Sequence, residues 1–578
     1  MRLPYNKLLM PTVMPRVSRT SPVPSNIQIA QAARPVQVTE IARLAGLRLE
    51  EIELYGSYKA KVTQKAFDRV MTRPNGKLIV VTGMTPTEAG EGKTSTAIGL
   101  TQALGRLRKR VILTLREPSI GPLFGRKGGA CGSGYAQVIP MEDINLHFTG
   151  DIHAVGTAHN LLAALLENHV VQGNALGVDP ERILWRRVSE IPDRQLRHVT
   201  VGQGGIGYLR RETGFDITVA SEVMAILALT TGFADLKERL GRIVVAYDKA
   251  GRPVTACELK AVGAMMVLLK DAVKPNVVQT LEGQPVFIHT GPFANLAHGA
   301  NSILATQLAL KLSDYAVTEC GFGSDLGFEK FCHIVARQGL FKPDVAVLVV
   351  TIRALKVQGG MSLAEATERE DVKSLQRGFE NLERHLGIIQ AFGVTPVVAI
   401  NRFSGDSALE MRVLQEHCVG LNLRYAVSEV TERGGEGGVE LAKAVLGALA
   451  ERGSRFQYLY EVDQPIREKL ETIARRVYGA DGVEYVDSAG KDVDRLTEEG
   501  YGKLPINVVR TQLSFTDDPQ VRGAPTGWKL KVRKMHVAAG AGFLVAIAGS
   551  ILLMPGLPKE PLAERMDVDG QGRITGLL

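Results

Sequence analysis

The feature that most constrains the fold is a short segment rich in glycine and threonine, TPTEAGEGKTST at Thr85–Thr96. An apolar run typical of a strand, LIVVTG (Leu78–Gly83), precedes it, and a helical pattern, TSTAIGLTQALGRLRK, overlaps its end. A second strand pattern, RVILTLRE, follows this helix. A strand, a helix and a strand in this order form a βαβ unit, which requires a parallel sheet with both faces covered. The segment therefore predicts an α/β fold with a loop at the carboxyl end of a strand.

The residue types in this segment are those of a phosphate-binding loop. Gly90 and Gly92 allow the backbone to approach an anion, and the free N–H groups at the start of the helix would point toward it. Lys93 supplies a positive charge for the β- and γ-phosphates of a nucleotide, and the hydroxyl of Thr94 can bind Mg²⁺. The strict pattern GxxxxGK[ST] has glycine where Thr87 stands, so this loop is a variant. A capped helix start with an incidental lysine is the alternative, but it leaves the agreement of strand, glycines and helix unexplained.

Further apolar runs of strand length recur along the chain: RIVVAY, PVFIHT, YAVTEC, VAVLVVTI and TPVVAIN. Helical stretches such as SLQRGFENLERHLGIIQAF separate many of them. We therefore predict an α/β fold, with a mostly parallel sheet domain of the phosphate-loop type and two smaller α/β or α+β domains. The expected organisation is a flexible N-terminal tail (1–26), a large nucleotide-binding α/β domain (27–360), a smaller α/β domain (361–455) and a C-terminal domain (456–578).

Residues 537–558, VAAGAGFLVAIAGSILLMPGLP, contain no charged side chain and are long enough to span a bilayer. Four glycines and two prolines in this stretch argue against a membrane helix. We expect two short buried strands joined at Gly549-Ser550, and no association with a membrane.

Charge and cysteine content exclude further classes of function. The 69 basic and 61 acidic residues give a net charge of +8. Four of these charges fall in the first 26 residues, which hold no acid and no apolar signal segment. The remaining excess is too small to indicate nucleic-acid binding, although it suits anionic small molecules. Five scattered cysteines without a CxxC pair fit a reducing, cytoplasmic environment, not a disulfide framework or a zinc ribbon.

Two glycine- or asparagine-containing motifs are weaker than the phosphate loop. The string at Gly202–Gly207 satisfies GxGxxG, but Gly214 interrupts the helix that should follow, so we expect a tight loop and not a dinucleotide site. The sequence at Asn401–Phe403 is similar to the guanine-reading NKxD motif, but Ser404 stands at its fourth position, so guanine selection is not expected.

Two candidate metal motifs are also weak. His147, His153 and His159 are spaced six apart, which does not place them on one face of a helix as metal ligands at i and i+4 would be. The segment beginning at Asp567 resembles half of a calcium loop, but the position of the bidentate glutamate is Leu578. We expect a polar β-turn there.

Longer blocks of the sequence resemble one enzyme family. REPSIGPLFGRKGGACGSGYAQVIPMEDINLHFTGD, together with TPTEAGEGKTST, is similar to formate–tetrahydrofolate ligase. Further blocks that agree are ETGFDITVASEVMAI, GPFANLAHGANSI, VTIRALKVQGG and MPGLPK. The resemblance runs in unbroken order from about residue 24 to the C-terminus. It implies a monofunctional, ATP-dependent C–N ligase that makes 10-formyltetrahydrofolate.

The family's reaction assigns roles to individual residues. Formate attacks the γ-phosphate of ATP to give formyl phosphate and ADP, and N10 of tetrahydrofolate then attacks the formyl carbon and releases phosphate. Arg116, at the end of a strand, matches a carboxylate or an acyl phosphate, although a salt bridge with Glu117 is the structural alternative.

The implied catalytic residues are Lys93, Arg116 and Glu117. The implied nucleotide- and folate-binding residues are Thr85, Pro86, Thr87, Glu88, Ala89, Gly90, Glu91, Gly92, Thr94, Ser95 and Phe392, with Thr94 also the metal ligand and Phe392 matching a pterin-stacking ring. Gly128, Gly129, Gly132 and Gly134 are expected to form a loop that closes over a small anion.

The chain departs from the family pattern at a few positions. Thr431 stands where the family usually has an aromatic residue, often Trp, that helps to sandwich the pterin. Gln358 replaces the usual His, and His333 and Val335 stand where Asp and Lys are usual.

The resemblance also implies substrates, cofactors and assembly. The substrates would be formate, ATP and tetrahydrofolate, with Mg²⁺ and a stimulating monovalent cation, in a homotetramer whose segment 361–455 contributes to the folate site. Two alternatives stay open: a phosphate-loop acyl (formate) kinase that stops at formyl phosphate, and a non-catalytic nucleotide-binding homologue with a weakened folate site.

Overall fold

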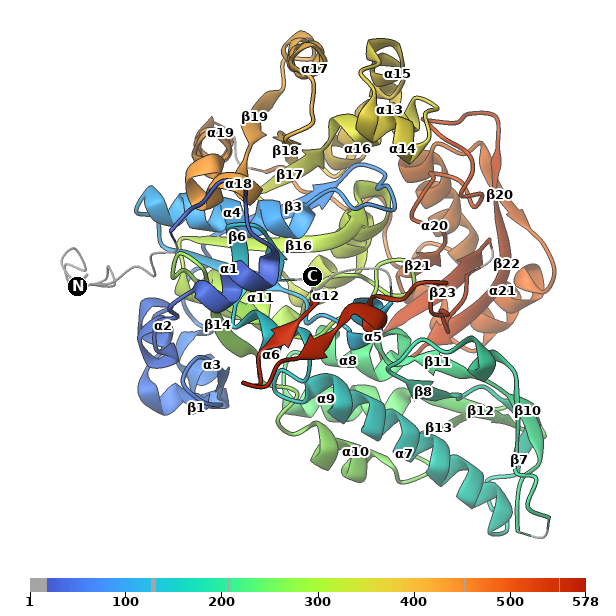
Figure 1. Ribbon diagram of the computed structural model, residues 1–578. Helices are drawn as coiled ribbons and strands as arrows, with labels where there is room; N and C mark the ends of the chain where they lie inside the picture. The colour runs from blue at the N-terminus through green and yellow to red at the C-terminus, as the bar shows by residue number, and fades with distance from the viewer. Residues whose placement is uncertain (1–17, 126–130, 206, 452–453, 550, 578) are drawn as a thin grey trace.

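The computed structural model describes residues 18–125, 131–205, 207–451, 454–549 and 551–577. Within these residues the largest element is a 12-stranded sheet, which runs from β19 at the top of Figure 1 to β1 at the lower left. Its strand order is β1 (Ile52–Leu54), β2 (Ala60–Val62), β14 (Asn276–Thr280), β15 (Pro285–Ile288), β4 (Val111–Leu115), β16 (Tyr315–Gly323), β3 (Lys77–Gly83), β17 (Val345–Val350), β18 (Thr395–Asn401) and β19 (Arg424–Ser428), with β5 (Gly132–Ser133) and β6 (Ala136–Ile139) at its side. From β15 to β19 along this order all neighbours pair in parallel. The predicted α/β architecture with a mostly parallel sheet is confirmed.

Helices cover both faces of the parallel strands, and consecutive strand residues enter two separate cores. Leu78 and Val80 of β3 belong to one core, and Ile79 and Val81 to the other. The covering helices are α11 (Ile303–Leu312) and α16 (Phe379–Ala391) on the first side, and α4 (Lys93–Arg106) and α19 (Val439–Glu451) on the second. Because neither face meets water, the strands are continuous apolar runs without polar alternation.

Strands on both sides of residue 360 lie in this one sheet. β17 precedes that residue and β18 follows it, and the two pair along their whole lengths, as at Val347 and Val397. Segment 361–455 thus extends the main sheet with β18, β19, α16, α17 (Ala408–Gly420) and α19. The domain boundaries drawn from the sequence stay predictions.

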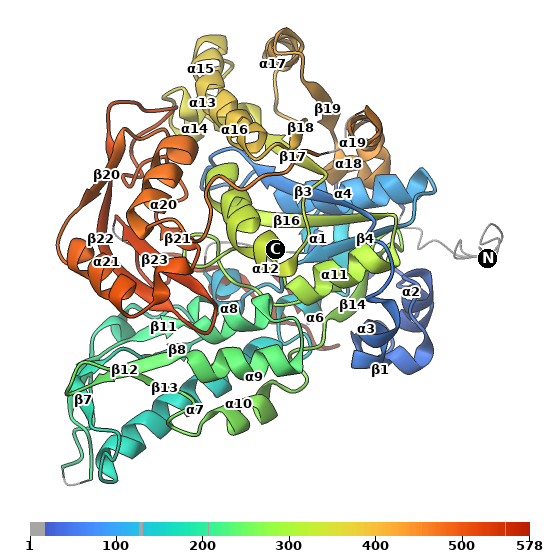
Figure 2. The ribbon, with the colours of Figure 1, turned by 180° about the vertical axis from the view of Figure 1, so that it is seen from behind.

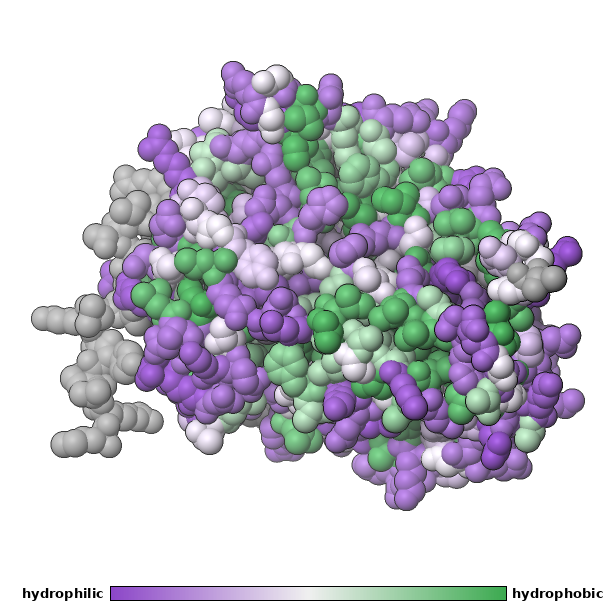
Figure 3. Space-filling view, turned by 90° about the horizontal axis from the view of Figure 1, so that it is seen from below, coloured by the Kyte–Doolittle hydropathy of each residue, from purple (hydrophilic) through white to green (hydrophobic). Residues whose placement is uncertain are grey.

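Two smaller parts flank the sheet in Figures 1 and 2. The lower lobe holds α7 (Asp151–Val171), α9 (Phe233–Arg242), α10 (Val262–Leu269) and the small sheet β13 (Pro253–Thr255), β12 (Val244–Asp248) and β7 (Val178–Ile183). The C-terminal part holds α20 (Ile466–Ile473), α21 (Ala489–Glu498) and the sheet β20 (Gly482–Tyr485), β22 (Lys529–Ala538), β23 (Phe543–Ala548) and β21 (Ile506–Val509). Figure 3 views the molecule from below and shows apolar residues gathered over part of that face. On the lower lobe, Val267 of α10 is 75% exposed.

The apolar stretch 537–558 supplies the end of β22 and all of β23, which pair antiparallel. The chain reverses at Ala539–Gly542, where Gly542 has a φ of 78°. The prediction of a junction at Gly549-Ser550 was wrong because Gly549 follows the second strand instead of preceding it; Ser550 lies outside the described residues. Among the residues that the structure describes, no helix is both long and apolar enough to cross a bilayer.

Two of the weaker motifs lie in hairpins. The string at Gly202–Gly207 joins β9 (Val199–Val201) to β10 (Arg211–Thr213), which pair antiparallel; Ile206 is outside the described residues. The segment after Asp567 joins β24 (Asp567–Val568) to β25 (Ile574–Thr575). There Asp569 accepts hydrogen bonds from the backbone of Gln571 and Arg573. The tight loop and the polar turn predicted at these places are confirmed.

Candidate active site

The predicted phosphate-binding loop, Thr85–Lys93, which is called the phosphate loop below, connects the carboxyl end of β3 to the first residue of α4. Gly90 and Gly92 have φ values of 76° and 74°, in the left-handed region that favours glycine. A Cβ atom at Gly92 would lie 2.3 Å from Nδ2 of Asn401. The same amide donates to the carbonyl of Glu91 at 3.1 Å. The loop is therefore seated against the end of β18, and glycine at position 92 is needed for conformation and for space.

Glu91 holds the loop together from inside. Its side chain is 1% exposed, and Oε1 accepts hydrogen bonds from the backbone N–H and the hydroxyl of Thr87 at 2.8 and 2.7 Å. Its Oε2 accepts from the hydroxyl of Thr351 and lies 3.8 Å from Nε of Arg353. Arg353 also donates to the carbonyl of Gly90. Thr87 thus replaces the usual glycine with a side chain that has a structural partner, and the carboxylate of Glu91 is occupied within the loop.

Lys93 lies across the end of β3. A Cβ atom at Gly83 would approach Cδ of Lys93 to 3.0 Å, so the glycine makes room for the lysine stem. Burial lowers the pKa of Lys93, while the carboxylates of Glu91 and Glu319 favour its charged form. An anion that took the place of water at the loop would likewise favour the charged form.

Thr94 and Arg116 converge on one buried carboxylate, that of Glu319. Glu319 lies on β16, which is hydrogen-bonded to β3 on one side and to β4 on the other. Its Oε2 accepts from the hydroxyl of Thr94 at 2.7 Å, and its Oε1 lies 3.6 Å from Nη2 of Arg116. Arg116 follows β4 and also donates to the carbonyl of Pro292 at 3.4 Å. The salt-bridge partner of Arg116 is thus Glu319 and not the neighbouring Glu117.

Glu117 follows Arg116 in the chain, and the charged groups that act on its carboxyl are Asp151, Lys61 and Glu190. Its side chain is 4% exposed, and Oε2 has no hydrogen-bond partner among the described residues. Burial, with a smaller effect of Asp151, raises the pKa of Glu117 well above its usual value, while Lys61 opposes the shift. Lys61 and Asp151 form their own buried ion pair at 2.7 Å. A carboxyl held in this way is suited to exchange a proton with a ligand.

His298 is a second buried group beside Arg116. Both ring nitrogens of His298 lack a hydrogen-bond partner among the described residues, and the side chain is fully buried. Burial, together with the positive charges of Lys330 and Arg116, lowers the pKa of His298 to about 3. His298 is therefore neutral, with one N–H to donate and one nitrogen to accept.

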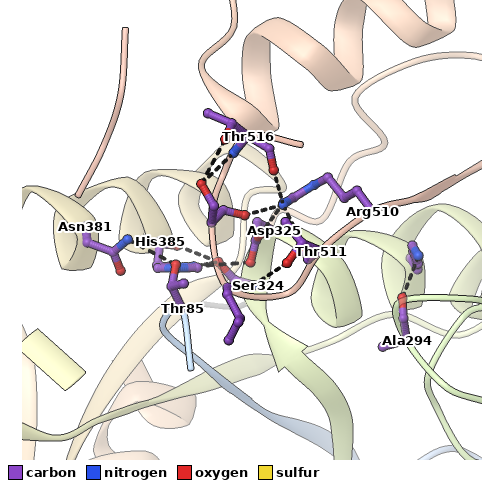
Figure 4. Close-up of polar contacts among 12 residues, drawn as sticks. Thr85, Ala294, Ser324, Asp325, Asn381, His385, Arg510, Thr511 and Thr516 are labelled. Atoms are coloured by element: carbon purple, nitrogen blue, oxygen red, sulfur yellow. Dashed lines mark hydrogen bonds and ion pairs between the residues drawn. The ribbon is translucent and has the colours of Figure 1, made fainter. Parts of the chain in front are cut away.

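Thr85 anchors the start of the loop and does not face the phosphate position with its side chain. It is fully buried, and its hydroxyl lies 3.0 Å from Nε2 of His385 and accepts from Nδ2 of Asn381 at 3.0 Å (Figure 4). The other ring nitrogen of His385, Nδ1, lies 2.8 Å from the hydroxyl of Ser324. Burial lowers the pKa of His385 to about 4, so the ring is neutral and can accept a hydrogen bond from Thr85.

This network continues to the C-terminal part of the chain. Asp325, next to Ser324, forms a buried ion pair with Arg510. The guanidinium of Arg510 also donates to the carbonyls of Thr511, Ser514 and Thr516 (Figure 4). The first residue of the phosphate loop is therefore connected through buried polar side chains to the segment that follows β21.

Phe392 is not at the site. It is 0% exposed, and its ring packs edge-on against Phe328 and His333 and parallel to Phe456. No face of this ring is free for a ligand, so its assignment as a pterin-stacking residue is corrected. The aromatic side chain next to the phosphate loop is Phe403, which is half-buried and lies 4.1 Å from the guanidinium of Arg353.

The glycine-rich segment packs beside α4, and its closing over a small anion stays a prediction. Ser133 lies between the hydroxyls of Ser95 and Thr431, at 2.8 and 3.4 Å. A Cβ atom at Gly134 would lie 2.0 Å from the carbonyl of Thr431. Gly128 and Gly129 lie outside the described residues. Of the remaining predicted loop residues, Pro86 is buried, whereas Glu88 and Ala89 are exposed at its outer turn.

A cavity of about 600 Å³ opens between the segments that carry Phe403 and Thr431. Its lining includes Arg402 and Asp406 after β18, and Glu429 and Arg433 after β19. Glu429 pairs with both Arg402 and Arg433, at 2.8 and 3.0 Å. A polar ligand could enter this cavity from the same sheet edge that carries the phosphate loop.

The donors around Thr94 fit Mg²⁺. A hydroxyl and a carboxylate, 2.7 Å apart, are the hard oxygen ligands that this ion prefers. No group of three or more His, Cys, Asp or Glu side chains suited to a metal occurs in the part of the chain that the structure describes. Mg²⁺ bound with a nucleotide takes only one or two protein ligands, the rest being water and phosphate oxygens.

Of the three histidines singled out from the sequence, His159 uses both nitrogens, toward Ser221 and the carbonyl of Arg186.

Sequence reasoning missed three of these residues. Glu319 could have been suspected because it is a lone acid near the end of an apolar strand, YAVTEC. Phe403 directly follows the strand end TPVVAIN and Arg402. His298 lies within GPFANLAHGANSI, and no pattern in the sequence indicated that its nitrogens would lack partners.

Comparison with protein families gives one finding. The family model described as formate–tetrahydrofolate ligase matches residues 24–578. The match includes every residue of the site described above.

Proposed function

The chain belongs to the formate–tetrahydrofolate ligase family, and on that premise we propose that it makes 10-formyltetrahydrofolate in two steps through formyl phosphate. The family assignment makes it an ATP-dependent ligase that joins formate to tetrahydrofolate. The observation that carries the proposed mechanism is the convergence of Lys93, Thr94 and Arg116 at the carboxyl edge of the parallel sheet. Ligands of open α/β sheets bind at this edge.

In the first step a carboxylate oxygen of formate attacks the γ-phosphorus of ATP, an O–P bond forms, and the bond to the β-phosphate oxygen breaks to release ADP. Catalysis of phosphoryl transfer rests on positioning and on stabilising charge. The backbone of Gly90–Thr94 and the ammonium of Lys93 would hold the β- and γ-phosphates, and Thr94 would contribute its hydroxyl to Mg²⁺. Arg116 would bind the formate and then the formyl phosphate, because its planar guanidinium matches both anions.

In the second step N10 of tetrahydrofolate attacks the formyl carbon, a C–N bond forms, and the C–O bond to phosphate breaks. The nitrogen loses a proton, which Glu117 would accept. A carboxylate whose pKa is raised by burial is a stronger base than an exposed one, so its environment suits this role. His298, also beside Arg116, would donate its N–H to the formyl or phosphate oxygen.

The folate would enter from the cavity between the segments that carry Phe403 and Thr431. Phe403 has a half-buried ring, and Thr431 supplies no second ring. A homotetramer and stimulation by a monovalent cation are proposed from the family alone.

The experiment that tests this function uses the purified chain with ATP, Mg²⁺, formate and tetrahydrofolate. Acid converts the product to the methenyl form, whose absorbance is followed. We expect product from the wild type and none from Lys93→Ala, with Lys109→Ala as the control because Lys109 is an exposed lysine shortly after the end of the same helix. Full activity of Lys93→Ala would remove the phosphate loop from the mechanism.

The same reaction mixture separates the two alternatives. Formate-dependent release of ADP without the methenyl product would select an acyl kinase. Absence of both signals, with ADP still bound, would leave a nucleotide-binding homologue.

A further inference from the structure

Glu319 lies beside Arg116 and Lys93, the two cationic groups of the site, and beside the hydroxyl of Thr94. β16 pairs with β3 in parallel register, and Glu319 lies opposite Val81, two residues before the end of β3. The side chain is 3% exposed. One oxygen accepts from Thr94 at 2.7 Å, and the other is 3.6 Å from Arg116. A carboxylate on the strand beside the phosphate-loop strand, bonded to the loop hydroxyl, is a pair of oxygen ligands already assembled for a cation.

We propose that Glu319 is a metal-positioning residue with two functions: it binds Mg²⁺ together with Thr94 when nucleotide enters, and it thereby releases Arg116 for the formate or formyl phosphate. This inference rests on the proposed function, because it assumes that a nucleotide occupies the phosphate loop. Glu319 directs one oxygen to each partner, so its charge is divided between Thr94 and Arg116 before metal arrives. At 3.6 Å the contact with Arg116 is an ion pair without a hydrogen bond, so the guanidinium can leave Glu319 while it keeps its 3.4 Å hydrogen bond to the carbonyl of Pro292.

The charges of the site explain why such a device is useful. In the absence of metal, Glu319 partly neutralises Arg116 and Lys93 and repels the incoming phosphates. With Mg²⁺ in place, the carboxylate becomes a metal ligand, and its negative charge no longer opposes the anion. Metal binding and the availability of Arg116 for formate or formyl phosphate are thus linked through the side chain of Glu319. Glu117 has no hydrogen bond to Thr94 and does not share this link.

The test measures binding and not turnover. ADP is titrated calorimetrically into the wild type and Glu319→Gln, with Mg²⁺ and with EDTA, and the ratio of the two affinities is the metal coupling. Glutamine has the same shape and still accepts from Thr94, but it is a poor Mg²⁺ ligand. We expect the coupling to fall about ten- to a hundredfold in Glu319→Gln. The metal-free affinity for ADP should stay the same or rise, because a charge that repels phosphate has been removed.

Two controls make the outcome decisive. Glu117→Gln, a second buried carboxyl of the site, should retain the wild-type metal coupling. Electron paramagnetic resonance of Mn²⁺ with ADP should show weaker Mn²⁺ binding only in Glu319→Gln. If that variant does not accumulate in folded form, Glu319→Asp replaces it, with the carboxylate withdrawn by one methylene and a smaller loss of coupling expected.

The possible results separate this inference from the proposed function. Wild-type coupling in Glu319→Gln, or a loss of metal-free ADP affinity in it, would overturn the role of Glu319 and leave the ligase assignment standing. Failure of the wild type itself to bind ADP would overturn the nucleotide assignment on which both rest.

Discussion

Replacing Arg510 by methionine should destabilise the protein more than any exposed arginine substitution, because it leaves a buried carboxylate without its partner. The exposed fractions of Arg510 and Asp325 are 0% and 2%. The guanidinium lies 4.2 Å from the ring centre of Tyr478 and donates to several backbone carbonyls. Methionine keeps much of the apolar volume but none of these donors.

The magnitude follows from what is left behind. Removing one partner of a buried ion pair costs about 3–5 kcal/mol, since the remaining charge is neither solvated nor paired. Adding Asp325→Asn removes that charge, so the double variant should recover about 1–3 kcal/mol of the loss. It cannot recover all of it, because the carbonyls that Arg510 served stay unsatisfied.

The assay is urea unfolding followed by tryptophan fluorescence. The chain has two tryptophans, so a Trp185→Phe background leaves Trp528 in the C-terminal part as the only reporter. Arg522→Met is the matched control, because Arg522 is exposed and donates to the nearby backbone carbonyls of Leu513 and Pro519. A loss below about 1 kcal/mol for Arg510→Met, or a double variant less stable than Arg510→Met, would refute the reasoning.

Three further predictions follow from the site and its surroundings. Gly92→Ala should weaken ADP binding more than Gly90→Ala. Both positions have a positive φ, which costs about 1–2 kcal/mol for alanine, but only at position 92 would the new Cβ lie 2.3 Å from Asn401. Calorimetry gives the ADP dissociation constants of both variants, and equal losses of affinity would contradict the predicted clash with Asn401. Thr431→Trp should lower the KM for tetrahydrofolate about fivefold, as expected for about 1 kcal/mol of ring stacking, and an unchanged KM would show that another group fills the position. Stability should fall steeply below about pH 6.5, because buried histidines whose folded pKa is lowered to about 4 or below stay neutral while the unfolded chain takes up protons. These histidines are His159, His289, His298 and His385. Each contributes a slope of about 1.4 kcal/mol per pH unit between its unfolded and folded pKa values, so the loss is complete near pH 4 for three of them and near pH 3 for His298. Urea midpoints that stay constant from pH 7 to 5 would contradict this.

The sequence was sufficient for the phosphate loop and the parallel strands because both are local patterns. LIVVTG, the paired glycines and Lys93 are contiguous, and a strand buried on both faces needs only an apolar run. Arg116 could be placed at a strand end for the same reason. The ion-pair partner of Arg116 could not be predicted, because Glu319 is distant in sequence and is brought to the site only by the strand order β4, β16, β3.

The direction in which a side chain points also could not be predicted from the sequence. Thr85 was assigned to the nucleotide because it begins the loop, but its hydroxyl is bound to Asn381 and His385 behind the loop. Phe392 was assigned to the pterin, whereas it ends α16 and its ring enters the core. The turn of the last apolar stretch was misplaced because several glycines could each have formed it, and only strand pairing selects Ala539–Gly542.

The central claim is tested most directly by following the oxygen atoms of formate. Formate labelled with ¹⁸O is supplied with ATP, Mg²⁺ and tetrahydrofolate, and the released phosphate is examined by mass spectrometry. If formate attacks the γ-phosphorus and N10 then displaces phosphate from the formyl carbon, each phosphate released carries one ¹⁸O atom from formate. Phosphate without the label, or label in AMP, would contradict the account.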